Sequence, residues 1–384
     1  MTLKTVVVLG ASFAGAKTAQ RIAAGLPTNG WRIVLVERNS HVNHPYVLPR
    51  FSVLPGHEHK AFIPTNNIFN VGTPNPNPQK YISLQATVQS ISSNTITLSR
   101  SFTRARHPYD QTAVRLCCSG KPFSGTKAGS IAWLKRKQDE LSSPAIKSVL
   151  VVGGGALGIQ FATDIAAVHP NKHVTLLHSR ERLLPRYKEA MHNEILAALQ
   201  EAKIEVILGE RLQITSSSAP GGVVRTTTGR EISADMVLLC TGQRPNTEIL
   251  SAFDQTTVNP QTGLAQVEHT MQLIGHPHIF VVGDAADAFG AIAAGWTADA
   301  QAEVAAANVL RLMRNESELV EYQPPQPAIK VSLGLHKNVI QRSNGSVSVG
   351  ELKRVDFGIA SMWRYFGWPV HLEEGQEDSE ELYK

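Results

Sequence analysis

The sequence predicts an α/β fold with two Rossmann-like units, because the order strand, glycine turn, helix and second strand occurs twice. In the first copy, an apolar run at residues 5–9 leads into Gly10-Ala-Ser-Phe-Ala-Gly15 and then into a helical segment. In the second copy, residues 148–152 lead into Gly153-Gly-Gly155-Ala-Leu-Gly158 and another helical segment. Two such units in one chain imply two bound dinucleotides.

The first turn has the residue types that a pyrophosphate site requires. Gly10 allows a sharp turn, the small Ser12 lets backbone approach the phosphates, and Gly15 lets the helix pack closely on the strand. The helix N-terminus adds free N–H groups and a partial positive charge. The next strand ends at Glu37, where such a unit places the carboxylate that accepts from ribose hydroxyls. Alone, such a stretch can also be an ordinary strand-to-helix turn, so the repeat strengthens the prediction.

Three segments separate the two units. Residues 38–55 are rich in proline and aromatic residues, which predicts a loop folded against a ligand, or a rigid surface loop, without a regular helix. Residues 80–99 alternate apolar and polar side chains, which predicts short antiparallel strands in a β-meander insertion. Residues 100–127 are basic, weakly periodic and broken by glycine and proline, so we expect a domain boundary before a helix at 131–141.

The second unit lacks an acidic residue after its second strand. The strand ends at Leu177 and continues into His178-Ser179-Arg180. An acidic group there favours a free 2′-hydroxyl, whereas serine and arginine can accept a 2′-phosphate. The sequence therefore allows NADPH as well as NADH, although Arg180 is also consistent with a surface arginine.

A second apolar strand with a carboxylate at its end lies further along the chain. Residues 278–282 run into Gly283-Asp284, so Asp284 contacts a ligand or caps a helix. A buried strand at 235–239 leads into Cys240-Thr-Gly242-Gln-Arg-Pro245. The remaining expected elements of this region are helices at 189–202 and 295–313, a strand at 204–208 and a hairpin at 222–232.

The C-terminal region predicts a small α+β module followed by an acidic tail. Strand-like runs occupy residues 328–335 and 347–352, with a hairpin turn at Asn344-Gly345. An aromatic cluster then forms either a small core or a surface for an apolar substrate or a membrane interface. The cluster consists of Trp363, Tyr365, Phe366 and Trp368. Residues 371–384 are expected to be a solvated, mobile end.

Composition limits the class of protein. The 384 residues suffice for two or three domains, and no apolar run is long enough to span a membrane. The first strand begins so early that we expect no leader peptide and a cytoplasmic protein. Cys117, Cys118 and Cys240 form no CxxC pair, which indicates a reducing compartment and no redox-active disulfide of that type. Cys117 and Cys118 are expected to be inert thiols, with a strained vicinal disulfide as the alternative.

The net charge of +5 is unevenly distributed. Without the acidic tail the chain carries a net charge of about +10. This charge could favour anionic cofactors, an anionic membrane surface or nucleic acid as partners. The alternative is a dispersed surface charge that has no partner. No zinc-ligand spacing, RNA-binding aromatic motif or regular basic helix accompanies this charge. Nucleic acid is therefore a disfavoured partner, and no metal site is expected.

The chain resembles the two-dinucleotide-binding flavoprotein oxidoreductases, because it carries a set of their motifs in the same order. These motifs are the two glycine turns, Glu37, the stretch from Cys240 to Thr247 and the run Ile279-Phe-Val-Val-Gly-Asp284. The resemblance extends to about residue 315. The absence of CxxC and the short C-terminal module are most similar to the branch of apoptosis-inducing factor and ferroptosis suppressor protein, with type II NADH dehydrogenases as close neighbours.

The resemblance implies FAD on residues 1–115 and 248–316, NAD(P)H on 128–247, a module at 317–370 and a disordered tail at 371–384. It also implies the residues that bind each cofactor. For FAD these are Gly10, Ser12, Gly15, Glu37, Gly283 and Asp284; for NAD(P)H they are Gly153, Gly155, Gly158 and Arg180; Gly242 and Pro245 form the turn that returns to the FAD domain.

Three departures from the family pattern concern chemistry near the flavin. Gln160 stands where the family has a glutamate, so it can bind nicotinamide but cannot be a charged base. Residues 109–120 replace the usual end of the first domain. Arg364 follows Trp363 where ferroptosis suppressor protein carries a lysine. Gln160 and Arg364 are therefore the candidate catalytic residues.

The resemblance implies an enzyme that passes hydride from NAD(P)H to FAD and then electrons to an acceptor, with a quinone favoured. The flavin carries the chemistry, so no acid-base triad is needed. Peripheral membrane contact fits a quinone substrate. The alternative is a signalling or nucleic-acid-binding flavoprotein, which only the basic charge supports.

Overall fold

The computed structural model describes residues 3–73, 76–100, 125–213, 222–242, 244–371 and 379–383. The departure at residues 109–120, with Cys117 and Cys118, lies outside these ranges. The expectations for that segment therefore stay predictions.

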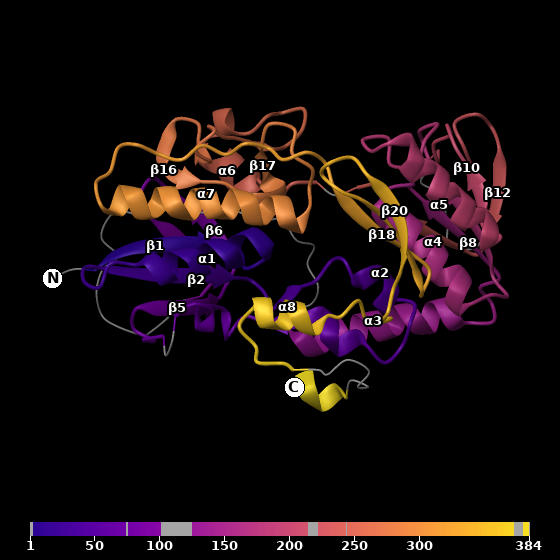
Figure 1. Ribbon diagram of the computed structural model, residues 1–384, viewed down its shortest axis with the longest axis horizontal. Coiled ribbons are helices and arrows are strands. Elements are labelled where there is room, and N and C mark those ends of the chain that lie inside the picture. Colours follow the sequence, from indigo (N-terminus) through magenta and orange to yellow (C-terminus); the bar gives the residue numbers. More distant parts are fainter. Residues whose placement is uncertain are drawn as a thin grey trace.

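The first Rossmann-like unit forms a three-stranded parallel sheet. Its strand order is β1 (Lys4–Leu9), β2 (Trp31–Glu37), β5 (Tyr81–Gln85). The apolar runs of β1 and β2 are almost entirely buried, because helices and loops cover both faces. Helix α1 (Phe13–Gly25) follows β1 and packs lengthwise against α7 (Gly295–Met313) (Figure 1). The bounds of α7 are those that the sequence predicted.

The segment predicted as short antiparallel strands divides between two structures. β6 (Val88–Ile91) and β7 (Ile96–Leu98) form an antiparallel hairpin. β5 instead pairs in parallel with β2 and extends the first sheet. That part of the prediction was wrong, because alternation reports a strand and its faces but not the direction of its partner.

The second unit forms a four-stranded parallel sheet in the order β10 (Glu205–Ile207), β9 (His173–Leu177), β8 (Ser148–Val152), β13 (Met236–Leu239). This order, with the fourth strand beside the first, is that of a mononucleotide-binding half. β13 was expected to be buried, but Leu239 is 54% exposed, because the strand lies at the sheet edge. The helix α3 (Lys127–Ser142) precedes this unit, whose other elements are α4 (Ala156–Val168), α5 (Glu189–Glu201) and the predicted hairpin of β11 (Gly222–Arg225) and β12 (Glu231–Ala234).

Short elements connect the units and return the chain to the first one. The segment predicted to lack a regular helix contains one turn of helix, α2 (Leu48–Phe51), which packs against α4. The remaining short elements are β3 (His41–Asn43), β4 (Phe62–Pro64), α6 (Glu248–Phe253), β14 (Ala265–Gln266), β15 (Gln272–Leu273), β16 (His276–Phe280) and β17 (Ala286–Asp287), together with the single 3₁₀ turns η1 (Glu58–Ala61), η2 (Ile68–Asn70), η3 (Gln255–Thr257) and η4 (Gly283–Ala285).

The C-terminal module is a three-stranded antiparallel sheet followed by a short helix. Its strands are β18 (Ile329–Leu333), β19 (Lys337–Gln341) and β20 (Val347–Glu351), and its helix is α8 (Ala360–Tyr365). The turn at Asn344-Gly345 is confirmed, with Gly345 at a φ of +81°. β19 was not foreseen, because its sequence Lys-Asn-Val-Ile-Gln carries no strict alternation.

The module contributes to both hydrophobic cores. Val331 and Val339 of the sheet pack with α4 and α5 in the core of the second unit. Trp363 and Phe366 lie in the core of the first unit. Figure 1 shows the sheet beside α4 and α8 beside α3. The module therefore fixes the two units relative to each other as well as covering them.

Residues 379–383 contradict the expectation of a mobile end. They contain the 3₁₀ turn η5 (Glu380–Tyr383), in which Tyr383 is only 1% exposed. Within the described ranges, no helix has the length and apolar character that crossing a membrane requires.

Candidate functional site

The first glycine turn has the conformation that its sequence predicts. Gly10 has a φ of +87°, which favours glycine, and its N–H donates to the carbonyl of Val36 at 2.8 Å. Ser12 is the N-cap of α1, and Gly15 is buried in the first turn of that helix. The turn therefore directs the N-terminus of a helix of 13 residues at the place where a pyrophosphate would lie.

Glu37 is joined to this turn directly. Its Oε2 accepts from the N–H of Ala11 at 2.8 Å, and its Oε1 accepts from the N–H of Asn39 at 3.0 Å. Burial raises the pKa of the carboxyl, and the backbone donors oppose that shift. Each oxygen retains a lone pair, so the carboxyl can also accept from the two hydroxyls of a ribose.

In the second turn, two of the three predicted glycines are required by the protein itself. Gly153 has a φ of +119°, and a Cβ there would overlap the carbonyl of Cys240. A Cβ on Gly158 would overlap the carbonyl of Gly153. Gly155 differs, because no described atom outside its neighbours lies within 4 Å of the Cβ position. Gly155 is also the N-cap of α4, so it opens space for a phosphate at that helix N-terminus.

His178 has a position equivalent to that of Glu37, although the sequence alone shows only that an acid is missing there. Its Nδ1 accepts from the N–H of Gly154 at 3.0 Å, as Glu37 accepts from Ala11. Burial lowers the pKa of His178, so the ring is neutral at pH 7. Arg180, two residues further, is exposed. The second turn therefore has an uncharged acceptor where the first has a carboxyl, with an arginine close by in sequence.

The later motif places its residues back beside the first unit. Gly283 has a φ of +75°, and its N–H donates to Oε1 of Gln301 on α7 at 2.7 Å. The side chain of Asp284 is reached by solvent, yet the surrounding protein raises the pKa of its carboxyl, as expected in a concave site. Gly242 has a φ of +102°, and Pro245 packs near Gly263 in the returning chain.

The two candidate catalytic residues lie apart. Gln160 on α4 is 4% exposed, and its Nε2 donates to Oγ of Ser332 on β18 at 3.0 Å. It thus joins the second unit to the C-terminal sheet. Arg364 on α8 is exposed to solvent. The structure does not bring these two side chains into one cluster.

The C-terminal aromatic cluster is an interior feature, which overturns the surface interpretation. Trp363 is 1% exposed and Phe366 is fully buried. The indole N–H of Trp363 donates to the carbonyl of Lys60, and that of Trp368 donates to the carbonyl of Pro64. The Tyr365 hydroxyl donates to Asp299 at 2.6 Å. Large aromatic groups with satisfied donors at these positions anchor α8 to the first unit.

A buried ion pair that the sequence did not predict joins the first unit, the second unit and the C-terminal module. Arg50 of α2 is fully buried, and its Nε and Nη2 donate to Oδ1 of Asp164 on α4 at 3.1 and 2.8 Å. Arg50 also donates to the carbonyls of Gly334 and Val355 in the C-terminal module. Burial outweighs the arginine and raises the pKa of Asp164 to about 6. Nothing local in the sequence pairs residues 114 positions apart.

Near Phe13 of the first turn, His44 and its neighbour Tyr46 each have a buried polar atom without a hydrogen-bond partner among the described residues. These atoms are Nδ1 of His44 and the hydroxyl of Tyr46. The ring of His44 lies 5.7 Å from that of Phe13 and 6.3 Å from that of Tyr46. Burial lowers the pKa of His44 to about 4 and raises that of Tyr46 to about 12. Unpartnered buried groups beside a cofactor turn are consistent with a ligand site there.

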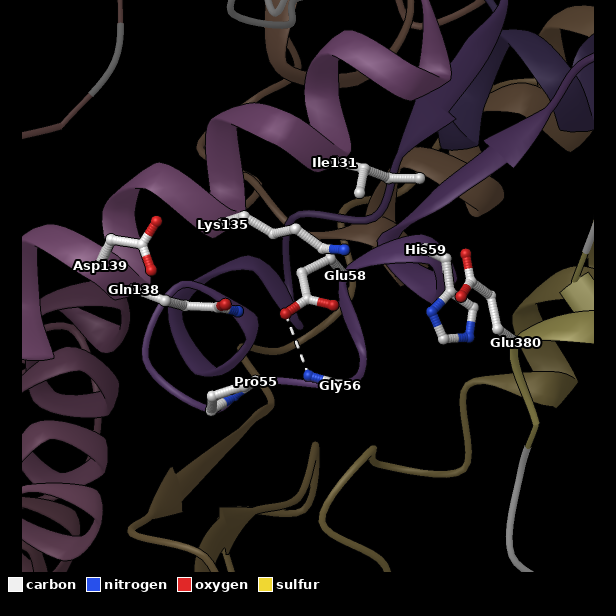
Figure 2. Close-up of a pocket in the computed structure, with 9 residues that line it drawn as sticks. All are labelled: Pro55, Gly56, Glu58, His59, Ile131, Lys135, Gln138, Asp139 and Glu380. Atoms are coloured by element: carbon white, nitrogen blue, oxygen red, sulfur yellow. Dashed lines mark hydrogen bonds between the residues drawn. The ribbon is translucent and has the colours of Figure 1, made fainter.

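These features fit the two cofactors. The first turn presents a helix N-terminus with a carboxyl acceptor, and the second presents a helix N-terminus with open space at Gly155. A cavity of about 410 Å³ lies elsewhere, between α3, η1 and η5 (Figure 2). None of the predicted cofactor residues lines it. Its lining residues are Pro55, Gly56, Glu58, His59, Ile131, Lys135, Gln138, Asp139 and Glu380.

Comparisons with known proteins agree with this geometry. Residues 4–308 match the pyridine nucleotide-disulphide oxidoreductase family. The chain is 39% identical to Fe-regulated protein 8 of Mycosarcoma maydis, over 94% of each chain. It is 26% identical to ferroptosis suppressor protein 1 of Xenopus tropicalis, over 94% of this chain and 96% of that one.

Among solved structures, the sulfide:quinone oxidoreductase of Aquifex aeolicus has the same fold. The TM-score is 0.71, with 15% identity over 95% of this chain and 91% of that one. At that identity the likeness concerns the fold alone. The matched residues include both glycine turns and the Gly283-Asp284 motif. The chain therefore belongs to the pyridine nucleotide-disulphide oxidoreductase family, and FAD and NAD(P)H are its cofactors.

Proposed function

We propose that this oxidoreductase transfers hydride from NAD(P)H to FAD and passes the electrons to a quinone-like acceptor without a redox-active disulfide. The observation that carries the proposal is the pair of matched turns, in which Ala11 donates to Glu37 and Gly154 donates to His178. Each turn holds one dinucleotide, and bound FAD supplies the redox chemistry. The absence of a CxxC pair from the sequence favours direct delivery to the acceptor.

The first site is proposed to belong to residues 1–115 and 248–316. Gly10, Ser12 and Gly15 approach the pyrophosphate, Glu37 accepts from the adenosine ribose, and Asp284 with Gly283 contacts the hydroxyls of the ribityl chain. Burial raises the pKa of Asp284, and hydroxyl groups of the ribityl chain that donate to its carboxylate would compensate for this desolvation.

The second site is proposed to belong to residues 128–247. Gly153, Gly155 and Gly158 form the pyrophosphate turn, and Arg180 binds a 2′-phosphate beside the neutral His178. Gly242 and Pro245 return the chain to the first site. Gln160 on α4 donates a hydrogen bond to Ser332, which fixes its side chain on the side of the site where the nicotinamide binds. Because an amide carries no charge, Gln160 helps to position the nicotinamide and does not act as a base.

The quinone is the finer part of the proposal. Its support is the similarity to a ferroptosis suppressor protein and the fold shared with a sulfide:quinone oxidoreductase. Arg364, exposed on α8, remains the candidate contact for an acceptor or an anionic membrane headgroup. Peripheral membrane contact is proposed on the same grounds.

The test starts from the absorption spectrum of the purified protein, which should show bound flavin. Anaerobic titration with NADPH and with NADH should bleach that spectrum at one equivalent, and addition of a water-soluble benzoquinone should restore it. If the flavin spectrum is bleached but the quinone does not restore it, hydride transfer from NAD(P)H to FAD is supported and a quinone acceptor is excluded. A spectrum that neither nucleotide bleaches would contradict the proposed function.

A further inference from the structure

The cavity between α3, η1 and η5 is lined by polar side chains that are themselves almost fully buried (Figure 2). Glu58 is 4% exposed, and His59 and Gln138 are each 7% exposed. Since none of the predicted cofactor residues lines the cavity, the two dinucleotide sites give these groups no role. Burying a polar side chain costs free energy unless it is hydrogen-bonded. Each group that lacks a protein partner therefore indicates what a ligand would supply.

Glu58 has a carboxylate that the protein satisfies only in part. Its Oε1 accepts from the N–H of Gly56 at 3.0 Å, and among the described residues no cation forms an ion pair with either oxygen. Figure 2 shows this carboxylate between Asp139 on one side and His59 on the other. A buried carboxylate with a single hydrogen bond leaves most of its acceptor capacity to the cavity.

Gln138 and His59 add two further acceptors. Nε2 of Gln138 donates to the carbonyls of Phe51 and Leu54 at 2.6 and 3.4 Å, which leaves its Oε1 as the group without a partner among the described residues. Nε2 of His59 is buried and also lacks a partner there. Burial lowers the pKa of His59 to about 4, so the ring is neutral at pH 7 and Nε2 can accept. Together with Glu58, these groups require N–H donors from a ligand.

The charge of the cavity has the sign that attracts such donors. Asp139 and Glu380 line it as exposed carboxylates, in addition to Glu58. Lys135 supplies one ammonium, so three carboxylates face a single cation among the described lining residues. The chain as a whole has a net charge of +5, so this excess of negative charge is local. An acidic cavity raises the local concentration of cations.

The shape of the cavity favours an extended ligand. Four of its lining residues lie on one face of α3: Ile131, Lys135, Gln138 and Asp139. From the first to the last of these the helix rises by about 12 Å. Figure 2 shows Asp139 near one end of the lining residues and Glu380 beside His59 near the other. No group of three metal-binding side chains converges within the described ranges, so charge spread along a chain fits better than one metal ion.

We propose that this cavity binds a linear aliphatic diamine as its dication. Glu58 and the amide oxygen of Gln138 accept from one ammonium, and Glu380 with Nε2 of His59 accepts from the other. The methylene chain passes along Ile131. Because Lys135 offsets one of the three carboxylates, two positive charges balance the remainder. A volume of about 410 Å³ lies in the range of small-molecule sites. The site is separate from both glycine turns, so the proposal does not depend on the proposed function.

The test measures binding of cadaverine, a five-carbon diamine, to the oxidised, FAD-containing chain by isothermal titration calorimetry without NAD(P)H. Salt at about 0.1 M screens attraction between distant charges. One equivalent of cadaverine should bind, and n-pentylamine, which has the same chain length but one charge, should bind at least tenfold more weakly. Equal affinity for the two amines, or no binding of cadaverine, would overturn the proposal.

Substitutions locate the site. Glu58→Gln should raise the Kd for cadaverine at least tenfold, because it removes the buried charge but keeps an acceptor for Gly56. Glu140→Gln is the matched control, since Glu140 lies on α3 outside the cavity and pairs with Lys137 at 2.6 Å; it should change the Kd less than twofold. Similar effects of the two substitutions would show that cadaverine binds elsewhere.

Two exposed positions keep the test decisive if Glu58→Gln does not fold. Asp139→Asn should raise the Kd at least threefold, because it removes one of the three negative charges. Lys135→Met should lower the Kd at least threefold, because it removes the cation that competes for the carboxylates. Tighter binding cannot result from a damaged fold. A Kd that neither substitution changes would rule out this cavity, whereas bleaching of the flavin by NAD(P)H is expected to persist in both variants.

Discussion

We propose that single residues distinguish the two dinucleotide sites. Glu37 and His178 occupy equivalent positions and accept the equivalent backbone N–H, yet one is a carboxyl and the other a neutral imidazole. A carboxylate repels the 2′-phosphate of NADPH, whereas an imidazole does not. The sequence shows that the acid is missing, but the acceptor role of His178 depends on the ring orientation and was not predictable.

Replacing His178 by aspartate should therefore reverse the nucleotide preference. We expect His178→Asp to raise the KM for NADPH at least tenfold, about 1.4 kcal/mol, with a smaller effect on NADH. Arg180→Ala should raise the KM for NADPH alone, since it removes the phosphate partner but adds no repulsion. Steady-state kinetics with both nucleotides would measure this. An unchanged ratio in both variants would mean that these side chains do not face the 2′ position.

Asp284 provides a test of the other site. Asp284→Ala should lower flavin content, because the variant loses the carboxyl at the Gly283 turn, while the second unit stays folded. The ratio of flavin to protein absorbance measures occupancy, and binding of NADPH to the variant checks the second unit. Glu194→Ala, which removes an exposed acid from α5, is the control. Full occupancy in Asp284→Ala would show that this carboxyl does not contact FAD.

At the scale of an element, the second turn contains glycines that the fold requires, and we propose that the bound nucleotide requires a further one, Gly155. A Cβ on Gly158 overlaps the carbonyl of Gly153, but a Cβ on Gly155 meets open space at an ordinary φ of −78°. Gly158→Ala should therefore lower the thermal midpoint. Gly155→Ala should leave the midpoint unchanged and weaken NADPH binding, because the methyl group takes the space of the phosphate. Similar losses of stability in both variants would refute this division of roles.

Elements were predictable where their signal is local. The helix at Gly295–Met313 follows from periodicity, and the Asn344-Gly345 turn follows from residue type. β5 was misjudged because the direction of pairing depends on a partner strand about 50 residues earlier. The buried Tyr383 was also missed, because its acidic neighbours indicate a solvated tail and its partners lie more than 250 positions earlier or on α8.

For the whole molecule, buried histidines should make the fold sensitive to acid. Burial lowers the pKa of His41, His44 and His59 from about 6.5 to about 4. Each of these histidines has a lower pKa in the folded state than in the unfolded state, so the folded state binds fewer protons between pH 6.5 and pH 4. Their contribution to stability is therefore fully present above about pH 6.5 and is lost as the pH falls from 6.5 to 4. Burial also raises the pKa values of four carboxyls, which act in the opposite direction: Glu37, Asp164, Asp284 and Asp299. Groups with lowered pKa values add to the effect of the three histidines: His169, His178, Glu210, Asp235 and Asp254.

The thermal midpoint should therefore fall as pH decreases from 6.5 to 4.5. His44→Phe should reduce the slope, because it removes one of the three groups and keeps an aromatic ring beside Phe13. Measuring the midpoint by circular dichroism in buffers of equal ionic strength separates this effect from screening. A midpoint that is constant over this range would mean that the three histidines are hydrated in solution.

The relative position of the two units should depend on one ion pair. Arg50 and Asp164 join α2 to α4, and Arg50 also binds two carbonyls of the C-terminal module. Removing one partner of a buried pair leaves a charge without compensation, which typically costs about 3–5 kcal/mol. Asp164→Ala should lower the free energy of unfolding by about that amount in urea, and Asp164→Asn by less, because the amide oxygen still accepts from Arg50.

The same variants can distinguish an effect on the relative position of the two units from an effect on the stability of the fold. If the pair sets the approach of nicotinamide to flavin, Asp164→Asn should slow anaerobic flavin reduction by NADPH while FAD content stays full. The double variant Arg50→Met with Asp164→Leu should recover part of the stability, since apolar replacements of buried pairs are often neutral, but the two module carbonyls lose their donor. Slow flavin reduction in that stabilised double variant would show that the pair is needed for geometry. Flavin reduction at the original rate in every variant would mean that packing of α4 against β18 alone holds the units in place.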